Sequence, residues 1–244
     1  MKILKFGGTS VGSPERIKNV ADLINDGEQK IVVLSAMSGT TNSLVEIADY
    51  LRKRNPESAS AVINHLRTTY FQHIEKLFSN NDMLNVTAQI LDDIFMHLHS
   101  FAGATFNEDA EKSILAQGEL MSTNMMTNYL KELGVNVCLL PALDYMKIDE
   151  NGEPDTAYIN QHLREILDQH KGYDIYITQG FICRNVNGGI DNLRRGGSDY
   201  TACLIGSALR ADEIQIWTDI DGMHNNDPRV VEGTTPVRQL HFEE

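Results

Sequence analysis

The opening of the chain limits its fold most, because it alternates two short apolar runs with a glycine-rich loop and a helical pattern. Residues 2–6 form a β-type run that leads into the sequence Gly-Gly-Thr-Ser-Val-Gly-Ser at residues 7–13. Ser13 and Pro14 are residue types that cap and begin helices, and the apolar residues after them recur at helical spacing. Residues 31–34 are apolar without interruption, as in strands of a parallel sheet that is buried on both faces. We therefore predict that the chain opens with a βαβ unit.

The remaining pattern continues this alternation of strands and helices. Residues 44–133 have a largely helical pattern, which is broken near Asn55-Pro56 and at the turn of residues 80–82. Further predicted elements are strands at residues 135–140, 175–178 and 214–217 and helices at residues 157–169 and 200–209. At 244 residues, with no internal repeat or flexible linker, the chain is expected to form one α/β domain.

The charge balance argues against two classes of partner. Lys and Arg number 21 against 34 Asp and Glu, a net charge of -13 that repels nucleic-acid backbones and anionic lipids. No apolar run reaches the length of a secretory signal or a membrane span. Cys138, Cys183 and Cys203 lack disulfide or zinc-site spacing, so they are interpreted as small buried hydrophobic residues of a reduced protein. We expect a cytoplasmic protein that binds neither nucleic acid nor membranes.

The loop after the first strand is predicted to bind phosphate. In parallel sheets, ligands bind beyond the carboxyl ends of the strands. Gly7 and Gly8 let the backbone approach a ligand closely there, and the following helix presents amide groups and the positive end of its dipole. Lys5, the last polar side chain before these glycines, is placed to reach the same phosphates.

Two other motifs overlap this loop. Residues 7–13 nearly match the Walker A pattern, but Ser13 stands where that pattern requires lysine, so a P-loop would lack its main phosphate-binding cation. Residues 8–12 match Gly-x-Ser-x-Gly, which would make Ser10 the nucleophile of a serine hydrolase. A hydrolase needs earlier strands to supply its oxyanion loop, whereas this motif follows the first strand. A glycine turn without a function is the third interpretation.

A second glycine-rich loop argues against a turn without a function. Residues 194–199, Arg-Arg-Gly-Gly-Ser-Asp, also precede a predicted helix. Arg195 offers a planar group that can bind a carboxylate or a phosphate through two hydrogen bonds. Ser198 and Asp199 occupy positions typical of a helix cap. A third loop, residues 218–222, follows the last predicted strand and adds hydroxyl and carboxylate groups at the same edge of the sheet.

Together these motifs resemble aspartokinase, and they occur in the order and spacing of that family. They are KFGGTS near the N-terminus, SAMSGTTN after the second strand, QGE, QGF, RGGSDYTA, and WTDIDG followed by DPR. The resemblance covers essentially the whole chain and implies the amino-acid kinase fold, a three-layer αβα sandwich with a mainly parallel central sheet. It also implies an enzyme that uses ATP, with Mg²⁺ carried by the nucleotide, to convert L-aspartate into L-aspartyl 4-phosphate. That reaction is the first step of the pathway to lysine, threonine and methionine.

The resemblance implies a role for each residue that matches a motif. Catalytic roles fall on Lys5 and Asp199, and no residue is assigned to a metal. Contacts with the nucleotide are implied for Lys5, Gly7, Gly8, Thr9, Ser10, Thr218, Asp219, His224 and Arg229. Contacts with aspartate are implied for Ser35, Thr41, Glu119, Phe181, Arg195 and Ser198. The chemistry is consistent, because L-aspartate presents one ammonium and two carboxylates to a set containing an acid, a cation and hydroxyl donors.

Two loops depart from the family pattern. Arg194 stands where glycine is common, and His224, Asn225 and Asn226 stand where tyrosine and threonine are common. Residues 1–244 are expected to be a catalytic domain truncated at its C-terminal end, without regulatory domains, from a protein that is a homo-oligomer at full length. Its start is similar to that of bifunctional aspartokinase/homoserine dehydrogenases. The alternatives are kinases of the same fold that act on acetylglutamate, glutamate, uridylate or carbamate, and a binding protein without turnover.

Overall fold

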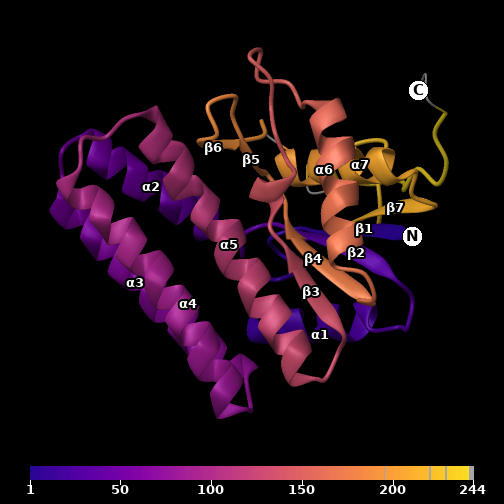
Figure 1. The fold of residues 1–244 in the computed structure, drawn as a ribbon, viewed down its shortest axis with the longest axis horizontal. Coiled ribbons are helices and arrows are strands. Elements are labelled where there is room, and N and C mark those ends of the chain that lie inside the picture. Colours follow the sequence, from indigo (N-terminus) through magenta and orange to yellow (C-terminus); the bar gives the residue numbers. More distant parts are fainter. Residues whose placement is uncertain (195, 220, 229, 242–244) are drawn as a thin grey trace.

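A five-stranded parallel sheet organises this computed structural model, which describes residues 1–194, 196–219, 221–228 and 230–241 (Figure 1). The strands lie in the order β3-β4-β2-β1-β7, and each neighbouring pair is parallel. Their bounds are β1 Lys2–Phe6, β2 Lys30–Leu34, β3 Val137–Leu140, β4 Ile175–Gln179 and β7 Glu213–Trp217. A separate antiparallel pair consists of β5 Ile182–Arg184 and β6 Ile190–Asn192.

Helices cover both faces of the sheet. They are α1 Pro14–Ile24, α2 Thr40–Arg52, α3 Pro56–Leu77, α4 Asn81–Ser100, α5 Glu108–Glu132, α6 Thr156–Gln169 and α7 Gly197–Leu209, with 3-10 turns η1 Phe101–Gly103 and η2 Ala142–Asp144. On one face Leu4, Val32 and Ile177 form a core with α1 to α5, and on the other Ile3 and Tyr176 pack with α6 and α7. The predicted three-layer αβα sandwich is confirmed, and α3 and α4 extend one helical layer away from the sheet (Figure 1). In the described part of the chain, no helix has both the length and the apolar character to cross a membrane.

The predicted βαβ opening is confirmed, and so are the breaks in the helical region. Pro14 is the first residue of α1, and the hydroxyl oxygen of Ser13 accepts a hydrogen bond from the Arg16 amide at 3.3 Å. Asn55 separates α2 from α3, and Asn80 caps α4 with its side chain. These residues accept hydrogen bonds from amides that the first helical turn leaves without a partner, which is why the sequence marks each boundary.

The predicted cap of α7 is wrong. The helix begins at Gly197, with Gly196 as its N-cap, so Ser198 and Asp199 lie in the first turn instead of at the cap. Gly196 has a left-handed φ of 82°, which glycine adopts without the steric penalty of other residues. The paired glycines therefore turn the chain, and the two polar residues are left to project from the helix start.

The cysteines differ in their exposure. Cys138 and Cys183 are buried, as predicted, and burial raises the pKa of the Cys183 thiol to about 12. Cys203 is exposed, which corrects the prediction for that residue. It lies on α7 between the buried residues Ala202 and Leu204, on the side of the helix that faces solvent.

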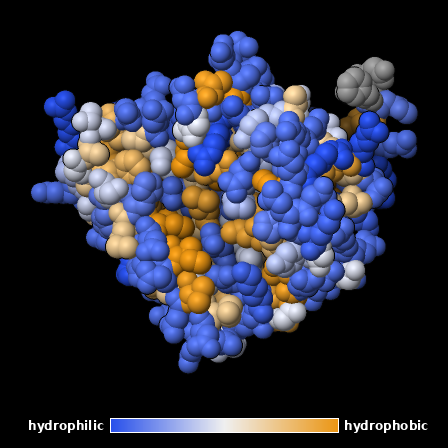
Figure 2. Space-filling model, in the orientation of Figure 1, coloured by the Kyte–Doolittle hydropathy of each residue, from blue (hydrophilic) through white to orange (hydrophobic). Residues whose placement is uncertain are grey.

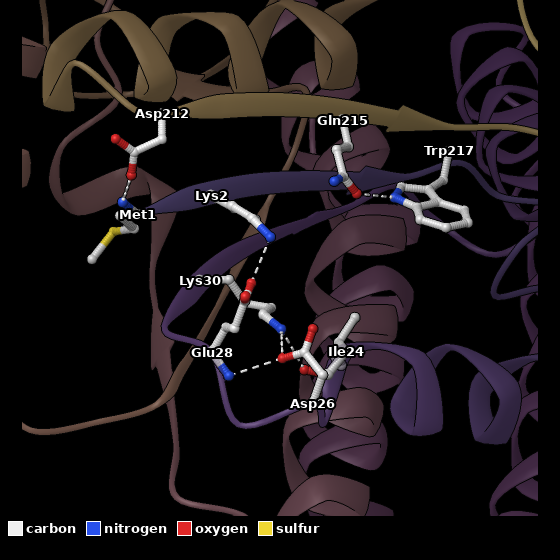
Figure 3. Close-up of polar contacts among 9 residues, drawn as sticks. All are labelled: Met1, Lys2, Ile24, Asp26, Glu28, Lys30, Asp212, Gln215 and Trp217. Carbon is white, nitrogen blue, oxygen red and sulfur yellow. Dashed lines mark hydrogen bonds and ion pairs between the residues drawn. The ribbon is translucent and has the colours of Figure 1, made fainter.

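A buried cation joins the end of α1 to the start of β2. The Lys30 side chain is 1% exposed, and its ammonium donates to the Ile24 carbonyl oxygen at 2.9 Å. The same ammonium forms an ion pair with Asp26, which also accepts a hydrogen bond from the Glu28 amide at 2.9 Å (Figure 3). The hydrogen bond from Lys30 holds the pKa of Asp26 below its usual range. The cluster thus fixes the C-terminal end of α1, whose other end adjoins the glycine-rich loop.

Replacing Asp26 by Asn should destabilise the protein by about 1–2 kcal/mol at pH 7, because Lys30 would keep its buried charge and lose the opposite one. The loss should shrink as the pH falls through and below the pKa of Asp26, since the wild-type carboxyl group then becomes neutral as well. Urea unfolding at pH 7 and at pH 2.5 measures both effects, because a lowered pKa requires a pH well below the usual range of an aspartate. Asp168→Asn is the matched control, because Asp168 pairs with Lys171 on the exposed surface; an equal loss in both variants would contradict the argument.

Candidate active site

The loops after β1 and β2 are in close contact at the carboxyl edge of the sheet. The Ser35 amide donates to the Phe6 carbonyl oxygen at 3.2 Å, and the Ser38 amide donates to the Gly8 carbonyl oxygen at 3.0 Å. A Cβ atom on Gly8 would lie only 2.7 Å from the Ala36 carbonyl oxygen. Glycine is therefore required at this position because another backbone segment occupies the space of a side chain.

Two further glycines let α5 and α7 approach the same edge. A Cβ atom on Gly118 of α5 would lie 2.6 Å from the Ala36 Cβ, and one on Gly180, after β4, would lie 2.5 Å from the Ser198 hydroxyl oxygen. Both separations are shorter than close-packed atoms allow. The glycines of the QGE and QGF motifs therefore set how closely the residues that follow them approach the strand ends.

A cavity of 300 Å³, here called the central cavity, lies between the strand ends, α5 and α7. Its lining consists of Lys5, Ser35, Thr41, Glu119, Phe181, Gly196, Gly197, Ser198 and Asp199. Every residue that the sequence assigned to catalysis or to aspartate lines this cavity, apart from Arg195, which lies outside the described residues. The structure thus brings together side chains from five separate segments of the chain.

An ion pair joins β1 to α7 in the central cavity. The Lys5 ammonium lies 2.7 Å from the Asp199 carboxylate, and the side chains are 12% and 51% exposed. Gly7 lies beside this lysine, and a Cβ atom there would make an ordinary contact with the ammonium nitrogen at 3.5 Å. Because an ammonium has three N–H donors, Lys5 can keep this pair and still bind the oxygen of a phosphate.

Glu119 is a buried carboxyl group at the wall of the central cavity. It is 5% exposed, and one carboxyl oxygen accepts a hydrogen bond from the Ala36 amide at 3.1 Å. Burial raises the pKa of Glu119 to about 7, and the Ala36 amide opposes that rise. The group is therefore poised to ionise when a cationic ligand enters, because an adjacent positive charge favours the carboxylate.

Phe181 lines the central cavity with a strained backbone. Its φ is 68°, a left-handed value that is rare for a residue with a side chain. The Phe181 amide donates to the Thr201 hydroxyl oxygen at 3.1 Å, and its carbonyl oxygen accepts from the Leu193 amide at 2.7 Å. A Cβ atom on Gly197 would lie 2.9 Å from the ring, so the second glycine of the 196–197 pair makes space for this phenylalanine.

A second cavity, of 260 Å³, opens beside α1 and is here called the peripheral cavity. The predicted nucleotide-binding residues that line it are Thr9, Ser10, Thr218 and Asp219. Arg16 and Trp217 also line it and were not predicted. The Arg16 guanidinium donates to the Thr9 carbonyl oxygen at 2.6 Å, and the Trp217 ring stacks on Phe6 with centroids 5.6 Å apart. Arg16 could have been found, because a long side chain in the first turn of a helix points back toward the preceding loop.

The other residues assigned to the nucleotide do not line the peripheral cavity. Gly7 and Gly8 line neither cavity, and Gly8 packs against Ala36 as described above. His224 lines neither cavity, and its side chain is 8% exposed. Its ring nitrogens contact the Asp221 carboxylate at 2.5 Å and the Thr234 hydroxyl at 3.0 Å, so the ring is engaged within its own loop. Arg229 lies outside the described residues.

The geometry weakens both alternative interpretations of the glycine-rich loop. Among the described residues, no histidine lines the peripheral cavity that contains Ser10. A serine nucleophile needs an adjacent base, so the hydrolase interpretation lacks its second component. The lysine beside the loop is Lys5, which precedes the glycines, whereas a Walker A lysine follows them.

Replacing Glu119 by Gln should raise the free energy of unfolding at pH 8 by up to about 3 kcal/mol, an amount that corresponds to a rise of about two and a half pKa units. The sign follows from the raised pKa: between about pH 4.5 and 7 the folded state binds more protons than the unfolded state, so wild-type stability falls as the pH rises. The variant should lack this loss, and the two proteins should be equally stable near pH 4. Urea unfolding from pH 4 to pH 8 tests this, with Glu165→Gln on the exposed face of α6 as the control. A difference between the two proteins that does not change with pH would contradict the argument.

Comparison with known proteins identifies a family that matches the whole chain. The model of the amino acid kinase family matches residues 1–244. Lysine-sensitive aspartokinase 3 of Escherichia coli (strain K12) is 32% identical over 246 residues, which cover 99% of this chain and 54% of that protein. Bifunctional aspartokinase/homoserine dehydrogenase 1 of Arabidopsis thaliana is 28% identical over 251 residues, covering 98% of this chain and 27% of that protein. The chain thus spans about half the length of the E. coli relative and a smaller part of the bifunctional one.

Solved structures agree with the family match. The crystal structure of E. coli aspartokinase III in complex with aspartate and ADP has a TM-score of 0.84 and 32% identity, over 97% of this chain and 53% of that chain. An aspartate kinase from Clostridium acetobutylicum shares the fold, with a TM-score of 0.77 at 22% identity. With the family model matched from the first residue to the last and the fold shared with solved relatives, the chain belongs to the amino acid kinase family.

Proposed function

We propose that this chain carries the catalytic region of an aspartokinase. The reaction would transfer the terminal phosphoryl group of ATP to the side-chain carboxylate of L-aspartate, giving L-aspartyl 4-phosphate and ADP. The central cavity carries this proposal, because it combines a lysine for phosphate with a buried carboxyl group and hydroxyls for an amino acid. The E. coli relative crystallised with aspartate and ADP supports the choice of substrates.

In this proposal the central cavity holds aspartate. Glu119 would bind the substrate ammonium, since a buried carboxylate lowers its own desolvation cost by pairing with a cation. The hydroxyls of Thr41 and Ser198 would donate to the substrate carboxylates, and Arg195 would hold one carboxylate through two hydrogen bonds. Phe181 would close the apolar side of the cavity.

The glycine-rich loop would hold the nucleotide phosphates. Lys5 would bind the transferring phosphoryl group, with its ammonium positioned by Asp199. Thr9, Ser10, Thr218 and Asp219 would contact the remainder of the nucleotide from the neighbouring peripheral cavity. We assign Mg²⁺ to the nucleotide, because this ion is bound mainly by phosphate oxygens and water in such sites.

The chemical step needs no general base. The aspartate carboxyl group has a reference pKa near 4 and is ionised at neutral pH. One of its oxygens attacks the terminal phosphorus of ATP, the bond from that phosphorus to the bridging oxygen breaks, and ADP leaves with the electron pair. Lys5 would offset negative charge on the transferring group, so the residues of this site act by positioning and by charge neutralisation.

The wider context belongs to the same proposal. An aspartate kinase catalyses the first step of the pathway to lysine, threonine and methionine, and the relatives are named as aspartokinases. Cytoplasmic localisation is favoured by the cysteines, which are all free. We also propose that the full-length protein forms a homo-oligomer.

Acyl-phosphate formation tests the reaction and the substrate together. With ATP and Mg²⁺, L-aspartate should give a product that hydroxylamine traps as a hydroxamate, whereas L-glutamate and N-acetyl-L-glutamate should give none. The discrimination is expected because the cavity walls fix the distance between the ammonium site and the phosphoryl acceptor. Product from another acid would overturn the substrate, and no product from any acid would overturn the activity of this chain.

Replacing Lys5 by Ala should lower kcat about 100-fold or more, because an electrostatic contact with the transferring group is lost. Steady-state kinetics and circular dichroism measure the loss of rate and the retention of the fold. Lys2→Ala is the matched control, since Lys2 lies on the same strand but pairs with Glu28 at the opposite edge of the sheet (Figure 3). A near-normal kcat in Lys5→Ala would contradict the role of Lys5 in binding the transferring phosphoryl group.

A further inference from the structure

A third cavity is larger than the other two and lies at the far end of α2 from the central cavity. It has a volume of 490 Å³, within the range of small-molecule sites, and is here called the distal cavity. It forms where the α2–α3 connection meets the segment between α4 and α5, at the end of the helical layer that extends from the sheet (Figure 1). Helix α2 separates the two cavities, because Thr41 in its first turn lines the central cavity and Arg52 at its end lines the distal one. Its 13 residues span about 20 Å.

The distal cavity combines an apolar wall with two arginines. Leu51, Phe101 and Phe106 supply apolar surface, and Arg52 and Arg54 supply positive charge. In a protein with a net charge of -13, a concave surface with this composition stands out from its surroundings. The lining thus offers both polar and apolar surface, so a ligand that fills the cavity needs a charged group as well as an apolar body.

The two arginines have different roles. Arg52 is already engaged, because its guanidinium contacts the carboxylates of Asp49 and Glu111 at 2.5 Å and lies 5.5 Å from the Phe106 ring centroid. Arg54 has no ion-pair partner among the described residues. Arg52 therefore builds the wall of the cavity, and Arg54 is the cation that remains available to a ligand.

The backbone conformation of Arg54 allows its side chain to be removed by substitution with glycine. Its φ is 56°, and the amides of Arg54 and Asn55 donate back to the last turn of α2. The end of α5 has the same pattern with Gly134, the residue type that favours this left-handed position. Arg210 ends α7 in the same way, with a φ of 51°, but it does not line the distal cavity.

We propose that the distal cavity binds a small anion with an aromatic body, such as an aryl carboxylate or an aryl phosphate. The anionic group pairs with Arg54, close to the positive end of α3, whose first residue, Pro56, also lines the cavity. The ring packs against Phe101 and Phe106. This inference does not depend on the proposed kinase activity, because no residue of the central or the peripheral cavity takes part.

Binding of phenyl phosphate, benzoate and inorganic phosphate to the whole chain tests the proposal, with Kd measured by ligand-observed NMR. Phenyl phosphate and benzoate should bind the wild type and Arg210→Gly equally, and Arg54→Gly at least ten-fold more weakly. Inorganic phosphate should bind at least ten-fold more weakly than phenyl phosphate, because it lacks the ring that packs against Phe101 and Phe106. Thermal unfolding should show that both glycine variants are as stable as the wild type or more so, since glycine relieves the left-handed strain.

Three outcomes would overturn the inference. The first is the absence of binding of both aryl anions to the wild type. The second is an equal Kd for the wild type and Arg54→Gly, which would place any binding elsewhere, including at Lys5. The third is an equal weakening in Arg54→Gly and Arg210→Gly, which would show a general effect of lost positive charge.

Discussion

The position of Ala36 is the constraint on which the candidate site depends. This residue lies between the glycine-rich loop and α5, so close to both that neither Gly8 nor Gly118 has room for a side chain. The close packing places the loop after β2 against the loop after β1, and it places Glu119, one residue after Gly118, against the Ala36 amide. A shift of a few tenths of an ångström at this point would move two walls of the central cavity, because packed interiors transmit displacement.

The central cavity contains charged groups at two separate places. At one side, Lys5 and Asp199 neutralise each other while both remain partly open to solvent. At another, Glu119 is buried with a single amide donor, which leaves its ionised form under-compensated. A ligand that carries both a cation and anions would satisfy both sides, whereas a simple phosphate or a simple amine would satisfy one. The charges that line the cavity are therefore complementary to a ligand that carries both a cation and anions, as the proposed substrate does.

The space-filling view of the molecule agrees with the charge count, since hydrophilic residues cover most of the visible face and apolar side chains gather mainly in the hollow between the helical layer and the sheet (Figure 2). Such a surface is expected of a strongly acidic chain whose apolar residues are used in two cores, one on each face of the sheet. The cationic side chains of the candidate site are therefore local exceptions in an acidic protein.

The sequence predicted most of the sheet and the segments that meet at its edge, because each polar loop directly follows an apolar strand. Other features depend on three-dimensional packing and were not predictable. Helix α5 is buried along nearly all of its second half, so helical periodicity does not tell which of its residues face a cavity. The cap of α7 was misassigned because Ser198 and Asp199 match cap preferences, whereas the adjacent glycines perform that role through backbone conformation. The partners of His224 come from its own loop, up to ten residues away, and no local pattern encodes them.

The place of β1 in the sheet has a consequence for the order in which the molecule is assembled. This strand contains Lys5 and lies between β2 and β7, so it pairs with a neighbour close in sequence on one side and with residues 213–217 on the other. During synthesis the second edge of β1 stays open until residues 213–217 have left the ribosome, since domains fold as their strands become available. Long-range parallel pairing of this kind is slow, and an open apolar edge is prone to wrong association. Lys5 therefore sits on a strand whose pairing is completed only when residues 213–217, far along the chain, have been synthesised.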